Sequence, residues 1–219
     1  MPHVKLGMFL MKIYDWHIAP NPRRLHIFLA EKGLTIPLEE VGGDDLKLNP
    51  AYVAKYPQAM VPMLELDDGT QIGEAMSICR YFEELHPWPP LMGTDARDKA
   101  LVEMWERRAN EEGLLAAGEL FRNTHPAFAD RGLPGTYEPI PQLPALVERA
   151  KARLDRFFAK FDAQLANNDF VAGIRYSIAD ATTLCAVDFA KWSEIEIPAN
   201  CKHLQRWYNE VSARPSAKA

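Results

Sequence analysis

The sequence is poor in the features that mark a metal centre, a disulfide scaffold or a membrane span. Three cysteines, Cys79, Cys185 and Cys201, lie far apart without a CxxC pair, and the six histidines show no HExxH spacing. These absences argue against a zinc site and a dithiol redox site. A sparse, odd number of cysteines suits a reducing compartment. No stretch of about 18 apolar residues occurs, so we expect no membrane-spanning helix.

The charge of the chain argues against one class of partner. Its 219 residues include 25 Lys and Arg against 30 Asp and Glu, a net charge of −5. No basic face of the size that nucleic-acid binders carry is visible. The apolar patch at residues 8–11 is too short for the core of a signal peptide. We therefore expect a cytoplasmic protein that binds a small molecule or another protein, with no nucleic acid and no membrane involved.

A change of pattern near residue 90 predicts two domains. In the first part, short apolar runs alternate with helical patterns, and the hairpin signal Asp67-Asp68-Gly69 joins two of the runs. A helix between two strands indicates a parallel crossover, whereas the hairpin adds antiparallel strands. The predicted order is β-α-β-α-β-β-α, with strands at Lys12–Asp15, Thr35–Val41, Met63–Leu66 and Thr70–Ile72 and helices at Pro22–Lys32, Asn49–Tyr56 and Glu74–Leu85.

The second part is predicted to be all helical. The proline-rich stretch Pro87–Pro90 is typical of a linker, and no strand pattern follows it. Prolines and glycines punctuate residues 123–144, which we interpret as a loop. The fold class is thus an α/β domain over residues 11–88 followed by an all-α domain over residues 94–219. Its predicted helices are Asp95–Asn123, Ala145–Ala166, Ser177–Lys191 and Lys202–Ala213.

Three short segments of the first domain have both a structural and a functional interpretation. Asn21-Pro22 opens the first helix as a strong N-cap followed by proline, and the same helix end would attract an anion. Pro62 at a strand entrance is either an edge proline or a cis peptide that presents the Val61 backbone to a ligand. Glu74 suits the first turn of any helix. It is the order and separation of the three that favour a ligand site.

Five stretches carry a further signal when they are taken together. In the first part they are residues 24–33, Val61-Pro62-Met63-Leu64, residues 69–75 and residues 78–83; in the second, Phe170-Val171-Ala172-Gly173 pairs with Ser177-Ile178-Ala179-Asp180. In this order they resemble the cytosolic glutathione transferase family, of a bacterial type, over nearly the whole chain. The resemblance implies a thioredoxin-like first domain, an all-helical second domain, a homodimer and glutathione as co-substrate.

The resemblance also implies which residues contact glutathione. Val61 would pair its backbone with the cysteinyl part, and Pro62 would be the cis-proline. Glu74 would bind the γ-glutamyl ammonium through a charge-assisted hydrogen bond. Ala75 would offer its backbone N–H to the γ-glutamyl carboxylate.

The sequence departs from the family's pattern at three polar positions. Ala75 replaces a usual serine, Met60 stands where glutamine or lysine is frequent, and Ala19 stands where many members have serine or cysteine. Each change removes a polar contact worth roughly 0.5–1.5 kcal/mol. Another group must therefore approach the glutathione thiol. We predict Asn21, whose amide oxygen would cap the helix while an N–H faces the thiolate, with Tyr14 as the next candidate.

Other residues have competing interpretations. His17, Trp105 and Arg108 are the candidates for the electrophile pocket, although a solvated loop histidine, a core tryptophan and a surface charge are the plainer assignments. Cys79 lies on the apolar face of its helix beside Ile78, and we expect it to be core rather than a reactive thiol.

The sequence thus predicts a glutathione transferase whose bound thiolate attacks a small electrophile, with no metal. Two other functions stay open. The three departures allow a weakly catalytic or non-catalytic glutathione-binding or assembly protein. A glutathione-dependent peroxidase or disulfide reductase is the other, and a reductase using Cys79 would need that thiol exposed. In the implied homodimer, Glu74–Leu85 and Asp95–Asn123 would supply most of the interface.

Overall fold

A computed structural model describes residues 11–44, 46–135 and 138–219, so most of the apolar patch at 8–11 lies outside the described residues. Four strands form one mixed sheet in the order β2-β1-β3-β4. β1 runs parallel to β2 and antiparallel to β3, which pairs antiparallel with β4. The predicted crossover and hairpin are therefore confirmed. The strands are β1 (Lys12–Asp15), β2 (Leu38–Glu40), β3 (Met63–Glu65) and β4 (Gln71–Ile72).

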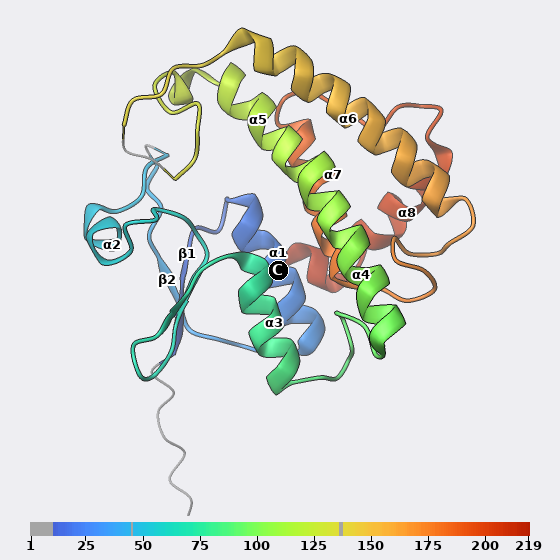
Figure 1. The fold of residues 1–219 in the computed structure, drawn as a ribbon, viewed down its shortest axis with the longest axis horizontal. Coiled ribbons are helices and arrows are strands. Elements are labelled where there is room, and N and C mark those ends of the chain that lie inside the picture. Colours follow the sequence, from blue (N-terminus) through green and yellow to red (C-terminus); the bar gives the residue numbers. More distant parts are fainter. Residues whose placement is uncertain (1–10, 45, 136–137) are drawn as a thin grey trace, which may run out of the picture.

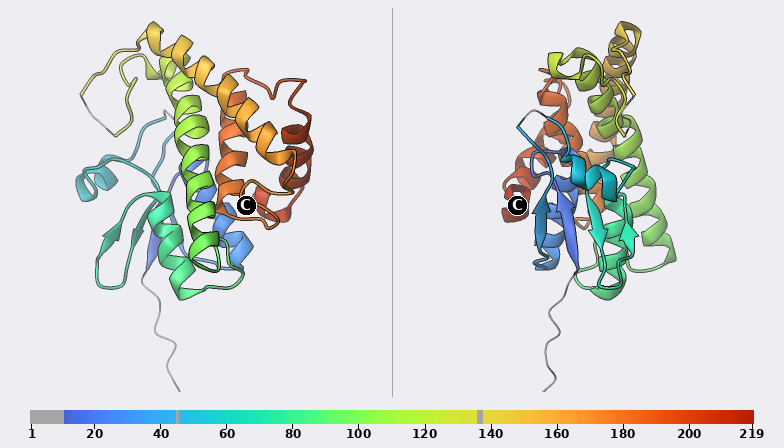
Figure 2. Two further views of the ribbon diagram at one scale, coloured as in Figure 1. Left: turned by 45° about the vertical axis from the view of Figure 1, so that its right-hand side comes forward. Right: turned by 90° about the vertical axis from the view of Figure 1, so that its left-hand side faces the viewer.

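Helices cover both faces of this sheet, which gives the predicted thioredoxin-like first domain. α1 (Pro20–Lys32) and α3 (Ala75–Leu85) lie between the sheet and the helical domain, and α2 (Pro50–Lys55) lies on the far side (Figures 1 and 2). The main core joins apolar side chains of α1, α3 and the sheet, whereas Tyr52 of α2 packs with Tyr14 in a smaller cluster on the other face. The sheet thus divides the first domain into two apolar layers.

Two predicted boundaries of the first domain are wrong. α1 begins at Pro20 rather than Pro22, because Ala19 is the last extended residue. Proline is tolerated in the first helical turn, where its missing N–H is not needed. The second strand covers only Leu38–Glu40 instead of Thr35–Val41, and all its residues are exposed at the sheet edge. α1 ends at Gly33, whose φ of 67° is left-handed.

The second domain is all helical, as predicted. The expected single helix over Asp95–Asn123 is one continuous run with a π-helical turn, Ala109–Leu114, at its middle (Figure 1). At this turn a Cβ on Gly113 would lie 2.7 Å from the Phe157 ring, so the backbone approaches the neighbouring helix closely. The helices are α4 (Ala96–Arg108), α5 (Leu115–Thr124), α6 (Pro144–Leu165), α7 (Ile178–Lys191) and α8 (Lys202–Ser212), with short 3-10 turns at Pro126–Phe128 and Pro215–Lys218.

A capping box at the start of α7 organises the centre of this domain. The Asp180 carboxylate is fully buried and accepts hydrogen bonds from the N–H and Oγ of Ser177. Its other oxygen accepts from the Val171 N–H at 2.9 Å and from the Trp207 indole at 2.8 Å. Burial raises the pKa of Asp180 to about 6, so the carboxylate is ionised at neutral pH.

A buried ion pair holds the connection between the domains. Lys32 Nζ lies 2.6 Å from the Glu83 carboxylate and also donates to the carbonyl oxygens of His86 and Pro89. The same carboxylate accepts from the N–H of Leu91. Charge and hydrogen bonds thus fix a stretch whose proline content gives it few backbone donors of its own. The proposed division between residues 88 and 94 falls in this connection.

Candidate functional site

β1 and β4 end, and β3 begins, on the same side of the sheet. We refer to this side, formed by strand ends, as the edge that carries the candidate site. Tyr14 of β1 lies opposite Met63 of β3, so continuing this antiparallel register places Val61 opposite the residues that lead into α1. In the same way Leu64 lies opposite Ile72, which places Glu74 opposite the start of β3. The beginnings of α1 and α3 and the segment before β3 are therefore neighbours. The sequence-predicted residues Val61, Pro62 and Glu74 all lie at this edge.

The backbone at this edge is free to receive a ligand. The Val61–Pro62 peptide bond is cis. Within the described ranges, neither the N–H nor the C=O of Val61 has a hydrogen-bond partner. Glu74 precedes α3 with a φ of 62° and an exposed side chain, and Ala75 is the first helical residue. An extended peptide paired with Val61 would thus run past the N-terminus of α3.

A polar cavity of about 190 Å³ lies between this edge and α4. Glu74 and Met76 contribute from the start of α3, and Arg24 contributes from α1. Three carboxylates and two guanidinium groups therefore face one small volume. The full lining is Arg24, Glu74, Met76, Glu103, Glu106, Arg107 and Asn110.

Arg24 is the centre of a buried polar network beside the cavity. It is 4% exposed, and its guanidinium lies 3.2 Å from Glu106 Oε1 and 3.0 Å from Asn110 Oδ1. Glu106 is 5% exposed and also accepts from the Thr182 hydroxyl. Burial raises the pKa of Glu106, and the Arg24 charge opposes that rise. The network fixes α1 against α4 and α7 directly behind the cavity.

Asn21 does not cap the helix, which corrects the prediction. Ala19 occupies the N-cap position and has no side chain to donate or accept there. Asn21 lies inside the first turn, and its Oδ1 accepts a hydrogen bond from Arg24 Nη2 at 2.6 Å. The amide oxygen is therefore held toward the buried network. The two N–H donors of the amide have no partner in the described part of the chain.

Tyr14 is not available as a hydroxyl for the thiol. It is 3% exposed, and its hydroxyl donates to Glu65 at 2.7 Å, near the opposite end of β1 from the site. The ammonium groups of Lys12 and Lys55 lie 4.8 and 5.0 Å from the ring centre. These contacts direct the Tyr14 hydroxyl toward Glu65 and away from the start of α1.

His17 lies apart from Trp105 and Arg108, the other two candidates for the electrophile pocket, which contact each other. His17 is exposed and contacts Glu40 through its backbone N–H and its ring. Trp105 packs edge-on against Phe161 in the core. Arg108 stacks on the Trp105 ring at 4.7 Å and belongs to the same helix. The plainer assignments of all three residues therefore agree with the structure.

Met60 and Ala75 bring no polar side chain to this edge. The Met60 carbonyl accepts a hydrogen bond from the Tyr52 hydroxyl at 2.5 Å, which holds the segment before Val61. Ala75 is buried, so its side chain offers only packing. Cys79 is fully buried, and burial raises the pKa of its thiol. A reductase that uses Cys79 would need an exposed thiol, and this thiol is buried.

Sequence reasoning missed Arg24, Glu106 and Asn110. Arg24 was visible only as part of a basic helix start, and its partners follow more than eighty residues later in the chain. The available signal was the apolar stripe of α1, because Arg24 falls among the buried positions Leu25 and Phe28. A charged residue on a buried face requires a buried partner.

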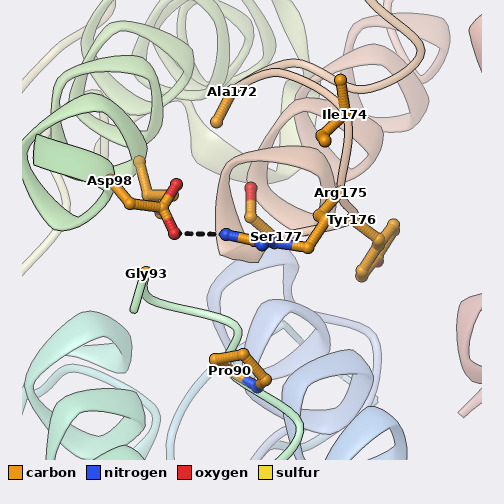
Figure 3. A pocket seen from close by; sticks show the side chains of 9 residues that line it. Pro90, Gly93, Asp98, Ala172, Ile174, Arg175, Tyr176 and Ser177 are labelled. Atoms are coloured by element: carbon orange, nitrogen blue, oxygen red, sulfur yellow. Dashed lines mark hydrogen bonds and ion pairs between the residues drawn. The ribbon is translucent and has the colours of Figure 1, made fainter. Parts of the chain in front are cut away.

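A second hollow, close to the domain connection, is too small for a metabolite. It has a volume of about 30 Å³ between Pro90, Gly93 and the segment before α7 (Figure 3). Arg175 closes it by donating to Asp98 at 2.6 Å. Such a volume suits one water molecule. Over the same described ranges, no group of three or more His, Cys, Asp or Glu side chains is arranged to hold a metal ion, and no helix is long and apolar enough to span a membrane.

Comparisons with known proteins agree with this geometry. Residues 13–90 match the family model of the glutathione S-transferase N-terminal domain, and residues 125–215 match that of the C-terminal domain. Glutathione S-transferase 2 of Saccharomyces cerevisiae is 33% identical over 214 residues, which cover 95% of this chain and 88% of that protein. The crystal structure of Gtt2 from Saccharomyces cerevisiae aligns with a TM-score of 0.84 and 30% identity over 94% of this chain and 98% of that one. A glutathione S-transferase domain-containing protein of Marinobacter aquaeolei VT8 aligns with a TM-score of 0.81 and 35% identity over 94% and 98% of the two chains. The chain belongs to the glutathione S-transferase family.

Proposed function

We propose that the protein is an active glutathione transferase that binds glutathione at this sheet edge and directs its thiolate at a small electrophile. The observation that supports this most is the charge arrangement of the cavity. The γ-glutamyl end of glutathione carries an ammonium and a carboxylate on one carbon atom. A cavity of about 190 Å³ whose walls carry three carboxylates, that of Glu74 among them, suits the ammonium, and the N-terminus of α3 beside it suits the carboxylate.

The binding mode follows from the groups that have no other partner. Glu74 forms no ion pair with another described residue, so its carboxylate is free to take the ammonium. The N–H of Ala75 points out of the N-terminus of α3, where the helix dipole favours the carboxylate. The Val61 backbone then pairs with the cysteinyl residue as an added strand would. This places the thiol near the start of α1.

The chemistry requires the thiol to ionise near neutral pH. A free thiol has a pKa near 8.5, and lowering it by two units requires about 2.7 kcal/mol. The N-terminus of α1 supplies about 0.3–1 kcal/mol, and about 2 kcal/mol in a partly buried geometry. One hydrogen bond to the sulfur must supply the rest. We assign this hydrogen bond to an N–H of Asn21, because Ala19 has no donor and Tyr14 points elsewhere.

The reaction itself is a substitution at carbon. The thiol proton leaves to solvent when the thiolate forms. The thiolate electron pair forms a new C–S bond while the leaving group departs with the electrons of the broken bond. Asn21 and the α1 N-terminus stabilise the charge on sulfur before the attack, and no redox partner is required.

Glu74→Gln tests the binding mode. The variant keeps the size of the side chain but removes the charge that holds the ammonium, so we expect glutathione affinity to fall roughly ten- to a hundredfold. Glu84→Gln, on an exposed position of the same helix, is the matched control and should bind as the wild type does. Calorimetric titration measures both. Equal affinities in all three proteins would show that Glu74 only opens the helix.

Turnover separates the enzyme from a binding protein. We expect the wild type to conjugate glutathione to a chlorinated dinitrobenzene, and a small hydroperoxide tests the peroxidase alternative in the same assay. Binding of glutathione without turnover of either substrate would favour the non-catalytic alternative. We further propose that the protein is a cytoplasmic homodimer, since the family is usually dimeric and cytosolic, and that it uses neither nucleic acid nor membrane as a partner.

A further inference from the structure

Tyr56, which follows α2, occupies the space of a missing side chain beside the site. A Cβ added to Gly73 would lie 2.1 Å from the Tyr56 hydroxyl oxygen and 3.3 Å from the ring carbon that carries it. Gly73 does not have the positive φ that would require glycine. Because Gly73 has no side chain, the Tyr56 hydroxyl can occupy the space beside it.

This hydroxyl lies at the ligand edge of the sheet. Gly73 directly precedes Glu74, and the β3–β4 register places it opposite Met63, the residue after the cis-proline. One helical turn before Tyr56, the Tyr52 hydroxyl is already bound to the Met60 carbonyl. Two hydroxyls of α2 and its C-cap thus reach the two backbone segments that border the site.

The Tyr56 hydroxyl is a donor without an acceptor. It is half-buried and has no hydrogen-bond partner among the residues described. Burial and the nearby charge of Glu74 raise the pKa of Tyr56, so the group keeps its proton at neutral pH. A protonated phenol beside an anion-binding helix start is suited to bind a carboxylate.

We propose that the Tyr56 hydroxyl donates a hydrogen bond to the α-carboxylate of the γ-glutamyl residue and takes over the role of the side-chain hydroxyl that Ala75 lacks. This inference rests on the proposed function, because it assigns a contact of the same ligand. Tyr56 is then a specificity residue for the γ-glutamyl end and has no part in the ionisation of the thiol.

The test measures the affinity of the wild type and of Tyr56→Phe for each of two ligands. Tyr56→Phe removes only the oxygen, and the second ligand is a glutathione analogue in which γ-aminobutyrate replaces the γ-glutamyl residue, so that the α-carboxylate alone is missing. We expect Tyr56→Phe to bind glutathione about tenfold more weakly than the wild type, because a hydrogen bond to a charged group is lost. Both proteins should bind the analogue equally. Tyr81→Phe, on α3 with its ring against Phe82, is the control for loss of a phenol and should change neither affinity.

A second pair of variants guards against an indirect effect. Gly73→Ala forces the hydroxyl away and should weaken glutathione binding as Tyr56→Phe does. In the Tyr56→Phe background the same change meets only the ring carbon at 3.3 Å, so it should add little further loss. Unchanged glutathione affinity in Tyr56→Phe, or an equal loss for both ligands, would overturn the inference. If the wild type itself fails to bind glutathione, the proposed function fails as well; if Glu74→Gln weakens binding and Tyr56→Phe does not, only the role of Tyr56 is refuted.

Discussion

Replacing Asn21 by aspartate distinguishes the role of the amide oxygen from the role of the amide N–H groups. The oxygen of Asn21 accepts from Arg24 at 2.6 Å, whereas its N–H groups are the donors that we assign to the thiolate. Asn21→Asp keeps an acceptor toward Arg24 and turns the contact into an ion pair. It also places an acidic residue in the first turn of α1, which the helix dipole favours. The folded state should therefore be as stable as that of the wild type.

The effect on the thiol should be large. A hydrogen bond to a charged group contributes about 1.5–3 kcal/mol, and each pKa unit corresponds to 1.36 kcal/mol. Loss of the donor alone raises the pKa of the bound glutathione thiol by roughly 1–2 units. The new carboxylate acts in the same direction, although the adjacent Arg24 charge opposes it. Below the thiol pKa, the thiolate population and kcat/KM should fall roughly ten- to a hundredfold.

Thiolate absorbance in the ultraviolet, recorded against pH with bound glutathione, measures this shift directly. Asn21→Ala provides the contrast: it should raise the thiol pKa too, but it also leaves Arg24 with one partner fewer and should lower the free energy of unfolding by about 1 kcal/mol. An Asn21→Asp protein with an unchanged thiol titration and full turnover would refute the assignment. The backbone N–H groups of α1 would then be the next donors to test.

Three further outcomes follow from the contacts of the helical domain and the chain's expected assembly. Asp180→Asn turns an N–H₂ group toward the donors that the carboxylate satisfies. Thermal denaturation at pH 7.5 should therefore show that the free energy of unfolding falls by about 2–4 kcal/mol. A decrease below about 0.5 kcal/mol would contradict the buried network. Burial tends to raise the pKa of Glu31, but hydrogen bonds from Arg214 and Ser216 outweigh it and lower that pKa below 4.5. The stabilisation is therefore present above pH 4.5 and disappears as the pH falls through the lowered pKa of Glu31. Glu31→Gln should lower the free energy of unfolding by roughly 1.5–3 kcal/mol at pH 7 and leave it unchanged at acid pH. A decrease that stays constant with pH would exclude the ionic contribution. Sedimentation at micromolar concentration should give a species of twice the chain mass, and a monomer alone would exclude the proposed dimer.

The fold was largely predictable because apolar periodicity and turn residues act locally. Gly33 ends α1 through its left-handed backbone, and Ser177 and Asp180 begin α7 through hydrogen bonds three residues apart. The π-helical turn at Ala109–Leu114 was not predictable, since it accompanies packing against Phe157, a residue more than forty positions away. The start of α1 was misplaced because Asn21 has the composition of a cap, while the structure uses Ala19 without a capping side chain.

The candidate site was predictable where backbone groups act and unpredictable where distant side chains meet. The groups that we assign to Val61 and Ala75 are backbone N–H and C=O groups, which do not depend on the side chain. The packing of Tyr14 was predictable from the sequence: Ile13 lies in the main core, so the alternation of a strand turns the next residue to the other face. The distant partners of Arg24 had no such local signal, because α4 and the π-helical turn bring Glu106 and Asn110 in from the second domain.

The three departures from the family's polar pattern have a common physical character. At residue 75 the backbone still offers its N–H, whereas the Met60 carbonyl already accepts from the Tyr52 hydroxyl, so what the chain lacks at both positions is a polar side-chain group. A tyrosine hydroxyl lies near each of these positions: the Tyr52 hydroxyl donates to the Met60 carbonyl, and the Tyr56 hydroxyl lies beside Gly73, the residue before Glu74. At residue 19 the corresponding neighbour is Asn21, whose orientation is fixed by a buried arginine. Displacing a polar group to a neighbouring position keeps its chemistry within reach of the ligand, and for this reason an alanine at a usual serine position is weak evidence against catalysis.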